Sequence, residues 1–134
     1  LLCAKHYAQA IYLLLIFTGM LRVIYRLIFL FVAEDRTLDG VSLLHPRDDS
    51  EKVRLGRENY AAYYSTVRLR DLASYIKGSR HGDLWQQFNI TVGALSGDDR
   101  FAAGRVHLSL PILGSYLWSP ASTAALNSSS LNGG

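Results

Sequence analysis

The chain has 134 residues, which is enough for one domain with its own core and too few for two. It is 49% hydrophobic and 19% charged, so it is more apolar than an average soluble domain. Its net charge of +3 permits contact with nucleic acid without requiring it. One cysteine, Cys3, excludes an internal disulfide and a zinc site built on several cysteines, which fits a cytoplasmic setting. We therefore expect an interior piece of a larger protein, with apolar surface that another part of that protein covers.

The first predicted element is a long helix over residues 11–36, buried inside a soluble protein. Thr18-Gly19 predicts a break or kink, because glycine weakens a helix. The apolar run is long enough to raise the question of a membrane span. Arg22 and Arg26 would then lie near mid-bilayer, at a cost of roughly 2.5–3.5 kcal/mol each, so the buried helix is favoured. A membrane anchor over residues 11–32 and a signal peptide are the alternatives.

Arg22 and Arg26 are four residues apart and so share one face of this helix. Two guanidinium groups on a buried helix need acceptors, because an unpaired buried charge is costly. Glu34, Asp35 or a group from elsewhere in the fold would supply them, which predicts a structural salt bridge. The alternative is that the two arginines reach a ligand or DNA.

Later elements follow from turn and cap signals. Leu38-Asp39-Gly40 predicts the end of the first helix, and residues 41–50 read as a loop in which Asp48-Asp49-Ser50 offers an N-cap. A helix is expected over residues 51–75, interrupted around residues 63–66, and a shorter one over residues 83–94, capped by Asp83.

Residues 106–118 are apolar but interrupted by Pro111 and Gly114, which favours an extended or irregular segment. The predicted fold class is therefore mostly α: an irregular helical domain over residues 1–120 with a partly extended C-terminal segment. Residues 121–134 are small and polar and are expected to form a linker or tail.

No catalytic, cofactor-binding or metal-ligating residue can be assigned from the sequence. It has no phosphate-binding glycine-rich loop, and its histidines lack metal-ligand spacing. The acidic pairs Asp48-Asp49 and Asp98-Asp99 read as solvated turns. The four histidines are His6, His45, His81 and His107.

Residues 47–80 hold eight basic side chains against five acidic ones, with tyrosines between them. This pattern suits a surface that contacts phosphates, although an ordinary solvated helix face with local ion pairs is the favoured interpretation. The candidates for DNA-phosphate contacts are Arg54, Arg57, Arg68 and Arg70.

Two motifs resemble a known family. Residues 21–36 (LRVIYRLIFLFVAEDR) resemble the LLRLLYRLLFLFVAEDR stretch in the helical region ahead of the catalytic domain of large adenine-specific DNA methyltransferases of bacterial restriction-modification and phage-defence systems. Residues 83–85 (DLW), followed by residues 108–120 (LSLPILGSYLWSP), are similar to the LW … LGLPALGGFLF-P pattern of the same family. The resemblance covers about residues 13–120. Ser109 departs from the usual glycine, and Ser115-Tyr116 from the usual Gly-Phe.

The resemblance implies a non-catalytic helical scaffold segment of a larger adenine-N6 DNA methyltransferase. The family's S-adenosylmethionine motif and its Asn/Asp-Pro-Pro-Tyr motif are not in this sequence, so the cofactor is expected only in the parent protein. The expected partners are the remainder of the parent chain and double-stranded DNA, with no membrane. The alternatives are a structural or protein-interaction module without a DNA role, and a membrane-associated protein.

Overall fold

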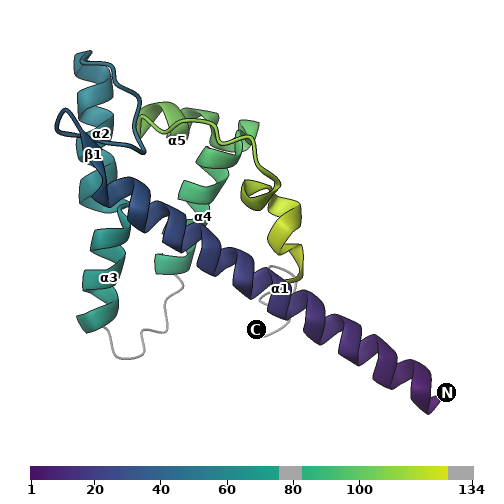
Figure 1. Ribbon diagram of the computed structural model, residues 1–134. Coiled ribbons are helices and arrows are strands. Elements are labelled where there is room, and N and C mark those ends of the chain that lie inside the picture. Colours follow the sequence, from purple (N-terminus) through teal and green to yellow (C-terminus); the bar gives the residue numbers. More distant parts are fainter. Residues whose placement is uncertain (76–82, 127–134) are drawn as a thin grey trace.

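A computed structural model describes residues 1–75 and 83–126 of the chain, and it confirms a mostly helical fold (Figure 1). One long helix, α1, crosses the molecule, and the remaining elements gather around its C-terminal half. A two-stranded sheet and an irregular C-terminal segment complete the fold. The five α-helices of the described residues are α1 (Leu2–Asp35), α2 (Glu51–Tyr63), α3 (Thr66–Tyr75), α4 (Asp83–Ser96) and α5 (Ala102–His107).

Helix α1 is continuous over 34 residues, so the predicted break at Thr18-Gly19 is wrong. Gly19 is buried, and a Cβ atom at this position would come within 3.0 Å of the Leu126 side chain. Gly19 therefore allows the Leu126 side chain to pack closely against the helix and does not end the helix. At about 1.5 Å per residue, α1 is about 50 Å long.

The predicted burial of residues 11–36 is also wrong for the first half of that range. The buried residues of α1 are Gly19, Arg26, Leu30 and Ala33, all in its C-terminal part. Before Gly19 the helix projects beyond the other elements, and its N-terminus is far from them (Figure 1). Apart from the half-buried Ile16, the apolar side chains of this projecting part are exposed within this chain.

A β-hairpin follows α1, where the sequence predicted only the end of a helix. Strands β1 (Thr37–Leu38) and β2 (Val41–Ser42) pair antiparallel, with Leu38 opposite Val41. The turn residues Asp39 and Gly40 have φ angles of 54° and 79°. Positive φ at both central positions defines the turn that matches strand twist, and Asp-Gly is a preferred sequence for it. The Asp-Gly pair was therefore the hairpin signal.

Helices α2 and α3 are separated where the sequence predicted an interruption. Ser50 caps α2 by accepting a hydrogen bond from the Val53 amide, which confirms the predicted N-cap group. The predicted helix over residues 83–94 is α4, and Asp83 is its first helical residue rather than its cap. The basic turn at residues 77–82, including Lys77, Arg80 and His81, lies outside the described residues.

The core lies between the C-terminal half of α1 and α2, α4 and the segment after α5. Leu108 and Leu110 are buried in that segment, and the Leu113 amide donates to the Leu95 carbonyl at 2.7 Å. Trp118, in the short 3-10 helix η2 (Tyr116–Trp118), packs edge-on against Phe29 of α1. The segment predicted to be irregular therefore packs on the core. The buried apolar residues are Leu30, Ala33, Leu44, Tyr60, Phe88, Val92, Ala94, Leu95, Leu108, Leu110 and Trp118.

The start of the predicted linker belongs to the packed domain. A further 3-10 helix, η3 (Pro120–Thr123), lies against α1, and its Ser122 and Thr123 are buried. The domain therefore continues past residue 120. Residues 127–134 of the predicted tail lie outside the described residues.

Candidate functional sites

Arg26 is the central polar group of the fold, because it joins α1 to η2 and η3. It is 1% exposed, and its Nε donates to the Leu117 carbonyl at 2.7 Å. Its Nη2 donates to the Ser119 carbonyl at 3.0 Å and to Ser122 Oγ at 2.6 Å, while its Nη1 donates to Thr123 Oγ1 at 3.3 Å. Burial, and then the nearby charge of Arg22, lower the pKa of Arg26.

Arg22 lies one turn before Arg26 and contacts the same segment. Its Nη1 donates to the Ser122 carbonyl at 2.7 Å, and its guanidinium lies over the Tyr116 ring, 5.2 Å from the centroid. Within residues 1–75 and 83–126, neither arginine forms an ion pair within 4.0 Å. The predicted salt bridge is therefore wrong: a segment 91 to 100 residues further along the chain supplies carbonyl and hydroxyl acceptors instead.

Glu34, one of the predicted partners of these arginines, binds α3. Its carboxylate accepts from the Thr66 amide, the Thr66 hydroxyl and the Tyr60 hydroxyl. Burial raises the pKa of Tyr60, and the Glu34 charge and hydrogen bond raise it further. This carboxylate is a structural cap.

The four candidates for phosphate contact lie on two helices and differ in their freedom to bind. On α2, Arg54 is exposed and 4.0 Å from Glu58, whereas Arg57 is mostly covered and donates to the Asp48 carbonyl. On α3, Arg68 donates to the Tyr63 carbonyl and the Gln87 side chain. Arg70 is exposed and lies over the Phe31 ring at 5.0 Å. Arg57 and Arg68 are thus held by the fold, while Arg54 and Arg70 face solvent.

An open groove of about 620 Å³ lies between the β-hairpin, α2 and the start of α3. Arg54 and Arg57 line it, together with Glu34, Glu58 and His45. His45 is buried: its Nδ1 lies 3.0 Å from the Ser109 carbonyl oxygen, and its ring packs edge-on against Tyr60. Burial lowers the pKa of His45, and the Arg57 charge lowers it further against the opposing effects of Ser109 and Glu34. The acidic and basic side chains in this groove nearly balance.

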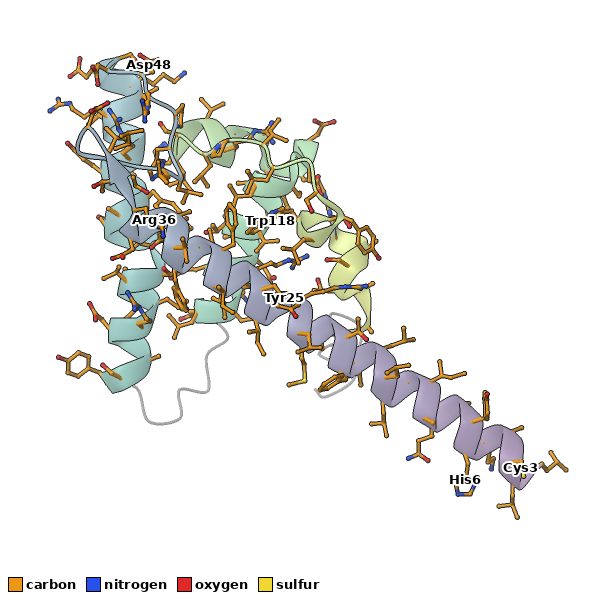
Figure 2. All side chains as sticks on the ribbon, viewed as in Figure 1. Cys3, His6, Tyr25, Arg36, Asp48 and Trp118 are labelled. Carbon is orange, nitrogen blue, oxygen red and sulfur yellow. The ribbon has the colours of Figure 1, made fainter. Side chains whose placement is uncertain are left out.

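The described part of the chain contains no cluster of side chains that could bind a metal ion. No group of three or more His, Cys, Asp or Glu side chains is arranged there to hold a metal ion. Figure 2 shows His6 and Cys3 on the projecting end of α1, far from Asp48 and Trp118.

The surface that sequence reasoning missed is the side of α1 that faces away from the domain. Six apolar side chains on this side are 48–63% exposed, and we call them the outer face: Leu14, Phe17, Ile24, Tyr25, Ile28 and Val32. They lie near-opposite the buried residues Gly19, Arg26 and Leu30 on the helix, since their spacing of three, four and seven residues keeps them on one side. Figure 2 labels Tyr25 on this helix, nearer to Arg36 than to Cys3. The spacing was visible in the sequence, but we expected one buried helix and so did not separate its two apolar sides.

Comparison with protein-family models, with curated proteins and with solved structures finds no match to this chain.

Proposed function

We propose that the chain is a non-catalytic helical scaffold segment of a larger, S-adenosylmethionine-dependent adenine-N6 DNA methyltransferase of a cytoplasmic restriction-modification or phage-defence system. The observation that carries the scaffold role is the outer face of α1, which is exposed while the opposite side packs on the domain. The methyltransferase assignment rests on the resemblance of residues 21–36 and 108–120.

The outer face supports a protein partner because of its extent. It runs from Leu14 to Val32, about 27 Å at 1.5 Å per residue, and no charged residue belongs to it. Contiguous exposed apolar surface of this kind marks a site that another surface covers. The proposed partner is the remainder of the parent chain, so that α1 is enclosed between two parts of one protein.

Association in trans tests this proposal. The 134-residue chain, co-expressed with the remainder of its parent protein, is expected to form a complex that survives size-exclusion chromatography. Phe17→Glu, Ile24→Glu and Ile28→Glu together are expected to abolish the complex and leave the helical circular dichroism signal in place.

A matched control places three glutamates on exposed alanines of other helices: Ala62, Ala73 and Ala103. This control is expected to bind as the unchanged chain does. A complex that tolerates all three outer-face substitutions would contradict the scaffold proposal.

Catalysis provides the second test. The chain alone is expected to bind no S-adenosylmethionine in calorimetry, and the complex is expected to methylate adenine in duplex DNA. Measurable binding of S-adenosylmethionine by the isolated chain would contradict the proposal that the cofactor site lies in the remainder of the parent protein.

The exposure of Arg54 and Arg70 narrows the proposed DNA contact to these two side chains. Reversing either charge removes an exposed cation. Each phosphate that is no longer neutralised reduces the slope of log affinity against log salt concentration by roughly 0.9. Arg57 and Arg68 hold internal carbonyls, so their reversal disturbs the fold as well.

Filter binding to duplex DNA at several salt concentrations, with Arg54→Glu and Arg70→Glu, measures this contact. Both substitutions are expected to weaken binding and to flatten its salt dependence. Binding that neither substitution weakens would contradict the contact at these two arginines, and no salt-dependent binding by the unchanged chain would favour the protein-interaction module without a DNA role.

One observation favours the membrane alternative. By length and composition α1 could cross a membrane, and only 17% of its most apolar window is buried. Residues 10–17 are all apolar and cover every side of the helix over two turns. Against this, Arg22 and Arg26 are fixed to η2 and η3, which leaves residues 6–21 between Lys5 and Arg22, a shorter stretch than a span of about 20 residues. Recovery of the chain only in the detergent-extracted fraction would support the membrane anchor.

A further inference from the structure

A cavity of about 240 Å³ lies beside Arg26, between α1, α4 and the segment of η3. Its polar lining comprises Arg26, Asn89, Ser96, Arg100 and Thr123, and Phe101 and Trp118 add apolar walls. No acidic side chain of the described residues lines it. The volume lies below the range of roughly 300–1,000 Å³ typical of pockets for drug-sized ligands, which favours a small ligand.

The charge around this cavity is unbalanced. Arg26 and Arg100 line it with two positive charges, and within the described residues the acidic side chain that pairs with either of them is Asp98, which lies 2.7 Å from Arg100. Two positive charges less one negative charge leave an excess of one, on the buried Arg26. Buried guanidinium groups are ordinarily paired with an anion, because an isolated buried charge is costly.

Within residues 1–75 and 83–126, the acceptors of Arg26 leave one of its N–H groups unused. A guanidinium has five N–H groups, and the four hydrogen bonds of Arg26 occupy Nε, both hydrogens of Nη2 and one of Nη1. The bond from Nη1 to Thr123 is also the longest of the four, at 3.3 Å. Asn89 brings an amide group to the same lining.

We infer that this cavity binds one phosphate-sized oxyanion, held by the Nη1 side of Arg26 with Arg100, Asn89 and Thr123 as neighbours. The anion supplies the counter-charge that the fold does not, and it ties α1, α4 and η3 together. This inference stands apart from the proposed scaffold role, since it depends on the inner side of α1 and not on its outer face.

The first test is thermal unfolding of the 134-residue chain in sodium phosphate and in sodium chloride of equal ionic strength and pH. A bound anion stabilises the folded state by mass action, so the Tm is expected to rise by several degrees with phosphate and to stay nearly constant with chloride. Equal curves in the two salts would overturn the inference. A series in acetate separates the two kinds of oxyanion, and an acetate effect as large as that of phosphate would overturn the assignment to phosphate.

Variants locate the effect. Arg100→Gln alters the lining at an exposed side chain and is expected to remove most of the phosphate-dependent rise in Tm. Arg54→Gln, a matched change of an exposed arginine outside the cavity, is expected to keep it. The reverse pattern would overturn the inference.

Backbone amide shifts measured by NMR during a phosphate titration add a readout that needs no variant. Shifts are expected at Asn89, Ser96 and Thr123 and not along α3. Shifts confined to α2 and α3 would instead indicate ordinary binding to surface arginines and overturn the site.

Discussion

The carboxylate of Glu34, near the end of α1, accepts hydrogen bonds from both the amide and the hydroxyl of Thr66, the first residue of α3, at 2.9 and 2.7 Å. The same carboxylate accepts from the Tyr60 hydroxyl at 2.6 Å. One side chain therefore caps a helix from a different element and satisfies a buried phenol. The first amides of a helix need acceptors, and a negative charge at this end also suits the helix dipole.

Glu34→Ala is expected to destabilise the fold by about 2–3 kcal/mol, since hydrogen bonds to a charged group contribute roughly 1.5–3 kcal/mol and the buried Tyr60 hydroxyl loses its partner. Thr66→Val removes only the hydroxyl bond and is expected to cost about 1 kcal/mol. Urea unfolding followed by circular dichroism measures both. Glu58→Ala, at an exposed glutamate of α2, is the control and should change stability little. A Glu34 variant as stable as this control would show that the cap contributes nothing.

Two glycines offer a contrast between packing and helix propensity. A Cβ at Gly56 of α2 would overlap the Ser109 hydroxyl, whereas a Cβ at Gly104 of α5 meets no atom within 4 Å. Gly56→Ala is therefore expected to destabilise by about 1–3 kcal/mol through overpacking. Gly104→Ala is expected to stabilise by up to about 1 kcal/mol, because alanine favours a helix. The midpoints of urea unfolding should move in opposite directions, and a shared direction would contradict the packing seen at Gly56.

His45 predicts a loss of stability in mild acid. Burial, its largest influence, lowers its pKa below the ordinary value of 6.5 in the folded state. Below pH 6.5 the His45 ring therefore binds a proton in the unfolded chain but stays neutral in the folded chain. The free energy of unfolding consequently falls as the pH falls from 6.5 towards the pKa of His45 in the folded state. Above pH 6.5 His45 is neutral in both the folded and the unfolded state, so it no longer makes the free energy of unfolding depend on pH.

Denaturant midpoints between about pH 7.5 and 5.0 measure this slope. His45→Asn keeps an amide donor for the Ser109 carbonyl and removes the titration, so its slope should be flatter than that of the unchanged chain. His107→Asn is the control at an exposed histidine and should keep the slope. Asp98 does not interfere, since its pKa is lowered from 3.8 and its transition lies below this range. Identical slopes for both variants would exclude His45 as the cause.

Local signals in the sequence predicted α2, α3 and α4 but not α5, the unbroken course of α1 or the contacts between the helices. The interruption between α2 and α3 and the Ser50 cap follow from short-range chemistry, and both were predicted. The partners of Arg26 could not be predicted in this way, because Leu117 and Ser122 lie more than 90 residues away in the chain and offer neutral acceptors. The sequence offered Glu34 and Asp35 as carboxylate partners near in the chain, and the fold uses Glu34 at Thr66 instead. The outer face was missed for another reason: helical periodicity gives the apolar sides of α1 without saying which of them this chain covers.

Arg26 and Arg22 provide the last prediction, because they share a segment and differ in burial. Arg26→Lys keeps the charge but loses the planar fork that reaches four acceptors, so it is expected to cost about 3 kcal/mol or more. Arg22→Lys loses one bond to the Ser122 carbonyl and the stacking on Tyr116, and is expected to cost about 1 kcal/mol. Urea unfolding should rank the two in this order. The reverse order would mean that the guanidinium of Arg26 does not hold η2 and η3 against α1.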